Sequence, residues 1–342
     1  MTNLSEATNI YFGAANGFEG FRSNFKEIFN HKEYNKLYVL KGGPGTGKST
    51  LMKKIAKRFS DNDKCKTTVI LCSSDPRSLD GLILECDDKR IGIVDGTAPH
   101  VVEAQFPGAI EEIINLADGF DYNALASRKE EILALGESKS YEYCKAYECL
   151  RIAGDVFEYV TDTFCNKEFY FEAEDCISKY IQNEISDNGY QKTSIFLLSS
   201  FGKNGYTFIE DVSIKKRKIH IGGDEISRYA SMRMLAEKLS EMNIRAKIFT
   251  SPLSTKNIDI IETSNTVYTV TSSETNYFGN LSEEYRELLN MYRYTLKLAQ
   301  DHFDLAAAYH FKLEDIYSAN TSFKNNDLQI EKMCKVIEKM LL

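Results

Sequence analysis

Nine consecutive residues near the start of the sequence have types and spacing suited to binding a phosphate chain. Gly42–Thr50 reads Gly-Gly-Pro-Gly-Thr-Gly-Lys-Ser-Thr and fits the pattern G-x-x-x-x-G-K-S. Glycine lets successive backbone N–H groups wrap phosphate oxygens, because a Cβ atom would obstruct or strain such a loop. We expect Lys48 to reach the β- and γ-phosphates of ATP and the Ser49 hydroxyl to bind Mg²⁺. The predicted ATP contacts are Gly42, Gly43, Pro44, Gly45, Thr46, Gly47, Lys48, Ser49 and Thr50.

The residues on either side of this segment predict the elements that position it. Leu37–Leu40 is an apolar, β-prone run that comes just before the glycines. After them, apolar residues recur at helical spacing from Leu51 to Phe59, with lysines and an arginine on the other face. A strand, a glycine-rich turn and a helix are the context of a P-loop, and the helix N-terminus adds further N–H donors.

A second strand is expected to supply a carboxylate to the same site. Arg90–Asp95 is an apolar run that ends in aspartate, which is the pattern of a Walker B acid that binds Mg²⁺. The alternative is an aspartate that merely begins a turn. Gly96 follows it, so the glutamate that serves as catalytic base in many motor-type ATPases is missing. We predict that Asp95 is both a metal ligand and a catalytic residue.

Three further polar residues follow predicted strands. The run Thr67–Cys72 predicts a strand, and a turn follows it. Ligands of open α/β sheets bind beyond the carboxyl ends of the strands, so Asp75, Asp80 and His100 are expected near the γ-phosphate. Turn formation and helix capping explain the two aspartates equally well, and a lone loop histidine is usually structural. We include Asp75 and His100 among the catalytic candidates.

The second half of the sequence repeats the first. Lys218–Gly223 can be laid over Tyr38–Gly43 without a gap, and in the same alignment Met232 falls on Met52 of the predicted helix. We therefore predict an α/β protein with two tandem P-loop NTPase-like units, residues 1–188 and 189–342. In each unit a mainly parallel sheet flanked by helices precedes a long helical region. These regions are interpreted as a packed helical hairpin, with a lid over the nucleotide as the alternative.

The two copies differ in the residues that would meet a nucleotide. The second copy replaces Gly45, Gly47, Lys48 and Ser49 by Glu225, Ser227, Arg228 and Tyr229. Glu225 places a carboxylate where phosphate would lie, Tyr229 cannot replace a compact hydroxyl on Mg²⁺, and Val270, near the position of Asp95, has no charge. We predict that the second unit does not bind ATP and serves as structure, regulation or a partner surface.

Composition limits the other classes of function. The chain has 342 residues, of which 43% are apolar, and a net charge of −8, so an extended core is expected and nucleic-acid binding is not. No apolar run reaches membrane-spanning length. Eight scattered cysteines are interpreted as unpaired, which points to the reducing cytoplasm. His302 and His310 lack partners at metal-ligand spacing, so no zinc site is expected.

At these motifs the sequence resembles a family of bacterial tandem P-loop proteins, described as predicted ATPases or nucleotide-kinase-like proteins of unknown role and common in spore-forming Firmicutes. Typical members carry usable P-loops in both halves, and this sequence departs from them in its second half. The resemblance rests on Tyr11–Ala14, Lys41–Thr50, Cys72–Pro76, Ser78–Gly81 and Asp95–His100.

These observations together predict a cytoplasmic Mg²⁺-ATP-binding P-loop NTPase. ATP hydrolysis that drives a conformational change is the favoured reaction, with Lys48 and Mg²⁺ stabilising charge on the phosphoryl oxygens. One alternative is a small-molecule or nucleotide kinase, which the glycine after Asp95 favours. Another is an ATP-dependent binding module without turnover. The partners expected are ATP and either a small-molecule acceptor or a protein.

Overall fold

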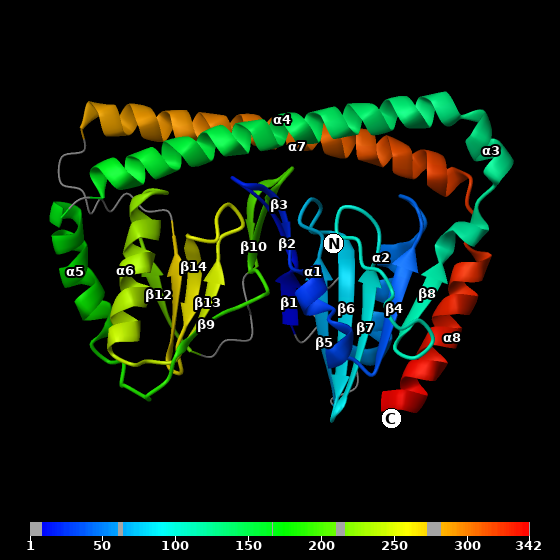
Figure 1. Cartoon of the computed structure of the whole chain (residues 1–342), viewed down its shortest axis with the longest axis horizontal. Coiled ribbons are helices and arrows are strands. Elements are labelled where there is room, and N and C mark those ends of the chain that lie inside the picture. The colour runs from blue at the N-terminus through cyan, green and yellow to red at the C-terminus, as the bar shows by residue number, and fades with distance from the viewer. Residues whose placement is uncertain (1–8, 61–63, 166, 210–215, 272–281, 342) are drawn as a thin grey trace.

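The computed structural model describes residues 9–60, 64–165, 167–209, 216–271 and 282–341. Two sheets stand side by side beneath a pair of long helices (Figure 1). The first sheet has the strand order β1-β5-β6-β7-β4-β8. Its strands are β1 (Asn9–Phe12), β4 (Lys36–Lys41), β5 (Cys65–Leu71), β6 (Leu79–Cys86), β7 (Lys89–Asp95) and β8 (Glu111–Asn115).

The second sheet repeats the order and directions of five of these strands. Its order, β9-β13-β14-β15-β12, follows that of β1-β5-β6-β7-β4, and each neighbouring pair keeps the same parallel or antiparallel sense. The repetition seen in the sequence is therefore also a repetition of topology. The strands are β9 (Gln191–Thr193), β12 (Arg217–Ile221), β13 (Ala246–Thr250), β14 (Ile258–Glu262) and β15 (Thr266–Val270).

Both sheets are mixed: most of their strands run in one direction, as expected, but each contains one reversed strand. β6 and β14 each run antiparallel to both of their neighbours. The reason is the length of the connections, because a parallel return needs a crossover of a dozen residues or more. Only residues 72–78 join β5 to β6, and only 87–88 join β6 to β7, where Asp87 has a φ of +52°. Such short links produce hairpins.

A β-hairpin follows the first strand of each half and reaches the other half. The tip of the first hairpin enters the second half, where the backbone N–H of Phe18 donates to the carbonyl of Leu253 at 2.8 Å. The second hairpin reaches back, and a Cβ on Gly202 would lie 3.1 Å from the carbonyl oxygen of Ser73. The hairpin strands are β2 (Ala14–Gly17), β3 (Gly20–Ser23), β10 (Ser199–Gly202) and β11 (Gly205–Phe208).

Two long helices, α4 and α7, lie side by side across both sheets (Figure 1). They run in opposite directions, as expected for the packed helical interpretation of these regions. The helices α2 and α6 follow β4 and β12, and each packs on the sheet of its own half. The helices are α1 (Phe25–Ile28), α2 (Lys48–Ser60), α3 (Tyr122–Ser127), α4 (Lys129–Phe164), α5 (Lys167–Ile181), α6 (Ser227–Glu241), α7 (Glu283–Ala319) and α8 (Lys324–Leu341).

The last helix of each half packs on the other half. Ile330 and Ile337 of α8 belong to the core of the first sheet, whereas Ile177 and Ile181 of α5 belong to the core of the second. α4 and α7 carry the chain across, so the two halves exchange their terminal helices (Figure 1). The boundary predicted near residue 188 falls between α5 and β9, but the hydrophobic packing crosses it.

One pair of cysteines is bonded, which corrects the expectation that all eight are unpaired. Cys65 and Cys86 face each other across the antiparallel pair β5–β6 and form a disulfide. The spacing of the two residues in the sequence gave no sign of this, because only strand pairing brings them together. Within the described ranges, no helix combines the length and apolar character needed to cross a membrane.

Candidate phosphate-binding site

The glycine-rich segment forms the turn between β4 and α2. Three of its residues, Gly42, Gly45 and Gly47, have φ values of +153°, +70° and +85°, which L-residues with side chains rarely adopt. Space is restricted as well, because a Cβ on Gly45 would lie 2.6 Å from the carbonyl oxygen of Glu314 in α7. Glycine is therefore required both by the shape of the loop and by the close approach of α7.

The side chain of Lys48 crosses the inside of this loop. Its ammonium group donates to the carbonyl oxygens of Gly42 at 3.0 Å and Gly43 at 2.9 Å. It also lies 3.7 Å from Oδ2 of Asp95, and both side chains are largely buried. The loop thus holds the ammonium group of Lys48 inside it, next to the carboxylate of Asp95.

Asp95 stands beside the loop because β7 pairs with β4. The strands are parallel and Asp95 is paired with Leu40, so the carboxylate emerges at the edge where the loop begins. Thr97 donates to Asp95 Oδ1 from its backbone N–H at 2.9 Å and from its hydroxyl at 2.6 Å. These bonds fix the carboxylate and leave Oδ2 on the side of Lys48.

A β-bulge brings a second carboxylate to this place. The pairing of β5 with β6 skips Asp80, and the register of β13 with β14 skips Asp259 at the equivalent point. Bulges bend a strand and redirect a side chain, and they are frequent beside functional sites. Asp80 is 6% exposed, and its Oδ2 lies 3.3 Å from Nε2 of His100. That contact is too poorly aligned for a hydrogen bond, so Oδ2 keeps an unused acceptor position.

Burial is the largest influence on the pKa of Asp80 and raises it, and the nearby charge of Asp95 acts in the same direction. His100, a hydrogen bond from Cys72 and the charge of Lys48 oppose the rise, and the net pKa of this carboxyl is about 6. A carboxyl group with a pKa near neutrality can accept a proton in a reaction at physiological pH. His100 itself is 7% exposed and stacks on Phe25 with ring centroids 4.3 Å apart, so it is packed among buried side chains next to Asp80.

The site also contains groups that suit Mg²⁺. The Ser49 hydroxyl accepts a hydrogen bond from the backbone N–H of Leu79 at 2.9 Å, so it lies beside the start of β6. Oδ2 of Asp80 is a buried acceptor atom without a hydrogen bond among the described residues, and Oδ2 of Asp95 faces the ammonium group of Lys48 at 3.7 Å. Among the same residues, no group of three or more histidine, cysteine, aspartate or glutamate side chains could hold a metal ion. Magnesium at nucleotide sites needs only one or two protein ligands besides phosphate and water.

Asp75 does not join this group. Its carboxylate is held by Arg77 at 3.0 Å and by Lys203, from the tip of the β10–β11 hairpin, at 2.9 Å. Burial raises its pKa, but hydrogen bonds from these two cations outweigh burial and bring it to about 2. A carboxylate that is paired in this way is a poor proton acceptor. Asp75 instead joins the two halves of the chain.

In the second half, side chains of the protein itself occupy the equivalent loop. The carboxylate of Asp259 accepts from the hydroxyls of Tyr229 at 3.1 Å and Tyr206 at 2.5 Å. Glu225 is paired with Arg293 of α7 at 2.7 Å. Tyr229 is fully buried and takes the place that Ser49 has in the first half. Two of the replacements noted in the sequence, Tyr229 and Glu225, are thus bound by other side chains of the protein.

Two residues at the first loop could not be located from the sequence. Glu314 of α7 touches Gly45, and the side-chain amide of Asn326 in α8 donates to the carbonyl of Thr46 at 2.9 Å. Both reach the loop because the two halves exchange helices. No local pattern around them indicates a binding site.

Comparison of the chain with protein-family models, with curated proteins and with solved structures finds no match in any of the three.

Proposed function

We propose that the first half binds Mg²⁺-ATP and transfers its γ-phosphoryl group to water. The observation that carries this proposal is the meeting of Lys48 and Asp95 at the end of β4, beside a turn built of glycines with positive φ. Backbone amides, a central ammonium group and a helix N-terminus together form a cradle for a triphosphate.

Each residue has a distinct part in the proposed reaction. Lys48 neutralises charge on the phosphoryl oxygens as the bond from phosphorus to the β–γ bridging oxygen breaks. Ser49 and Asp95 would hold Mg²⁺, which supplies further charge neutralisation when bound. Asp80 accepts the proton of the attacking water, whose oxygen forms the new bond to phosphorus. The products are ADP and inorganic phosphate.

The position of α7 favours coupling of this reaction to a change in shape. The helix touches the first loop through the backbone of Glu314 and the second loop through the ion pair of Arg293 with Glu225. A nucleotide that moves the first loop would therefore act on one end of a continuous helix. The second half, whose loop is filled by its own side chains, would respond without binding a nucleotide.

Phosphate release from Mg²⁺-ATP by the full chain tests the proposal. Lys48→Ala should lower the rate by a factor of about 10²–10³, as expected when one main stabiliser of developing charge is removed. The matched control is Arg228→Ala, which alters the equivalent position of the second half and should leave the rate unchanged. Equal loss in both variants would contradict the assignment to the first half. ADP formed only after a metabolite pool is added would assign a kinase instead.

A further inference from the structure

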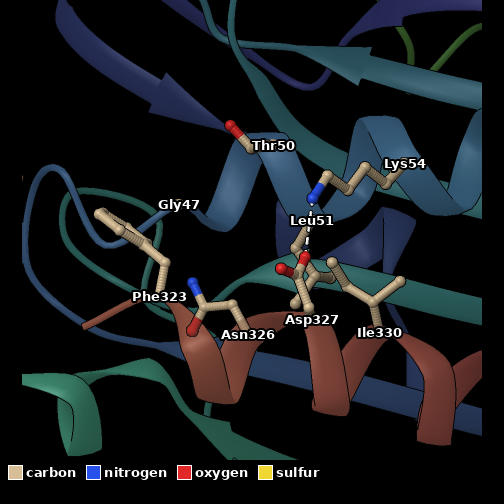
Figure 2. Close-up of a pocket in the computed structure, with 8 residues that line it drawn as sticks. All are labelled: Gly47, Thr50, Leu51, Lys54, Phe323, Asn326, Asp327 and Ile330. Atoms are coloured by element: carbon tan, nitrogen blue, oxygen red, sulfur yellow. Dashed lines mark hydrogen bonds and ion pairs between the residues drawn. The ribbon is translucent and has the colours of Figure 1, made fainter. Parts of the chain in front are cut away.

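A cavity of about 180 Å³ lies beside the loop, between the first turns of α2 and the start of α8 (Figure 2). One water molecule needs only about 10–15 Å³ on the same measure, so the cavity has room for a ring system. Gly47 and Thr50 of the loop segment form one wall. Phe323 and Asn326 form the other, at the beginning of α8.

The cavity lies on the flank of α2 that faces away from the aspartates. Ser49 is bonded to Leu79 and so faces β6, whereas Lys54 pairs with Asp327 of α8 at 2.8 Å (Figure 2). The order of the strands places Asp95 on the same flank. Asp95 ends β7, which pairs with one edge of β4, whereas β8 pairs with the other edge of β4. The γ-phosphate belongs near Lys48 and Asp95. The nucleoside of a bound nucleotide must therefore leave the loop at the opposite flank, where the cavity begins.

The chemistry of the cavity suits a flat heterocycle. Phe323 is 41% exposed, and its ring lies 3.6 Å from the position of a Cβ on Gly47. An exposed aromatic face beside a phosphate-binding loop can stack on a base. Leu51 and Ile330 add apolar surface beneath it. Asn326 is 8% exposed, and its hydrogen bond to Thr46 ties this wall to the loop.

We propose that this cavity receives the base of the nucleotide, with the ring of Phe323 stacked on it. The inference rests on the proposed function of the loop, and it assigns base recognition to α8, which the second half contributes to the first. The phosphate chain and the base would then be held by segments from opposite ends of the sequence. Binding would draw the start of α8 toward the loop.

Calorimetric titration of the full chain with Mg²⁺-ATP and, separately, with inorganic tripolyphosphate tests the inference. Phe323→Ala should weaken ATP binding roughly tenfold, the effect of losing one stacked base. Tripolyphosphate has no base, so its affinity should not change. Phe323→Tyr should bind ATP like the natural protein because it keeps the ring. Leu328→Ala, at an exposed residue of α8 outside the cavity, is the control for changes to this helix.

The two ligands separate failure of this inference from failure of the proposed function. If Phe323→Ala binds ATP as tightly as the natural protein, the base lies elsewhere while the loop assignment stands. Equal weakening of ATP and tripolyphosphate would mean that the variant disturbs the loop, and would also overturn the inference. If the natural protein binds neither ligand, the proposed function itself is wrong.

Discussion

Replacement of Asp80 by asparagine should stabilise the protein at neutral and alkaline pH while removing the proposed proton acceptor. The carboxyl is 6% exposed, and burial raises its pKa from 3.8 to about 6. Because the folded-state pKa lies above the unfolded value, folding favours the protonated form. The unfolded chain loses this proton as the pH rises through 3.8, and the folded chain loses it only near pH 6. Stability therefore falls across this interval and stays low above it.

The size of the effect follows from the shift. A difference of about two pKa units, at about 1.4 kcal/mol each, corresponds to about 3 kcal/mol above pH 6. Asparagine has a similar shape and no charge, so Asp80→Asn should recover most of this free energy. For a chain of this length that unfolds in one transition, the gain corresponds to about 4 °C in melting temperature. Loss of a general base should lower ATP hydrolysis by a factor of about 10²–10⁴.

Thermal unfolding followed by circular dichroism at pH 4 and at pH 8, together with phosphate release at pH 8, measures both effects. The variant should melt higher than the natural protein at pH 8 and at nearly the same temperature at pH 4. Asp88→Asn, at an exposed residue of the turn after β6, is the matched control and should change neither quantity. A lower melting temperature at pH 8, or an equal gain at both pH values, would refute the reasoning.

Three other predictions concern the loop, the junction of the halves and the disulfide. Gly45→Ala would place a side chain at a φ of +70° and a Cβ atom 2.6 Å from a backbone oxygen of α7. It should therefore lower the melting temperature and weaken ATP binding at least tenfold. Unchanged calorimetric titrations would contradict this prediction. Because cationic partners bring the pKa of Asp75 to about 2, its ion pair stabilises the fold above pH 3.8 and is lost as the pH falls through 2. Lys203→Ala should therefore lower the free energy of unfolding by about 1–2 kcal/mol at pH 7, as measured by denaturant titration. The difference between the variant and the natural protein should vanish near pH 2. A difference that does not change with pH would argue against the Asp75–Lys203 ion pair. The Cys65–Cys86 disulfide closes a short loop and should contribute about 3 kcal/mol to the free energy of unfolding. Reduction should therefore lower the melting temperature. Peptide mapping without reductant should recover the two cysteines in one linked peptide pair.

The elements around the loop could be predicted because they depend on neighbours in the sequence. The apolar run before Gly42 is buried as β4, and the helical spacing from Leu51 to Phe59 matches the buried face of α2. The structure also brings Lys48 and Asp95 together, as expected for the ends of parallel strands. The repeat predicted a second unit with the same elements, and the two sheets share their strand order.

Other features depend on which strands pair and could not be predicted. Nothing in the sequence marked β6 as a central antiparallel strand or placed a bulge at Asp80. Asp75 was expected near the γ-phosphate, but the hairpin of the other half supplies Lys203 as its partner. A carboxylate predicted from its place after a strand can thus be paired instead with a cation from a distant segment of the chain.

What the sequence determines by itself is the local chemistry: a turn that only glycines can form, the lysine within it, and a second copy in which bulky side chains replace them. These properties follow from the φ values, volumes and charges of residues that are adjacent along the chain. Only the tertiary structure decides that the two halves exchange their last helices, so that α7 touches the loop and α8 forms a wall of the neighbouring cavity. An apolar helix face gains the same free energy by burial on either sheet. The choice therefore depends on the path of the whole chain across α4 and α7, which no short stretch of sequence encodes.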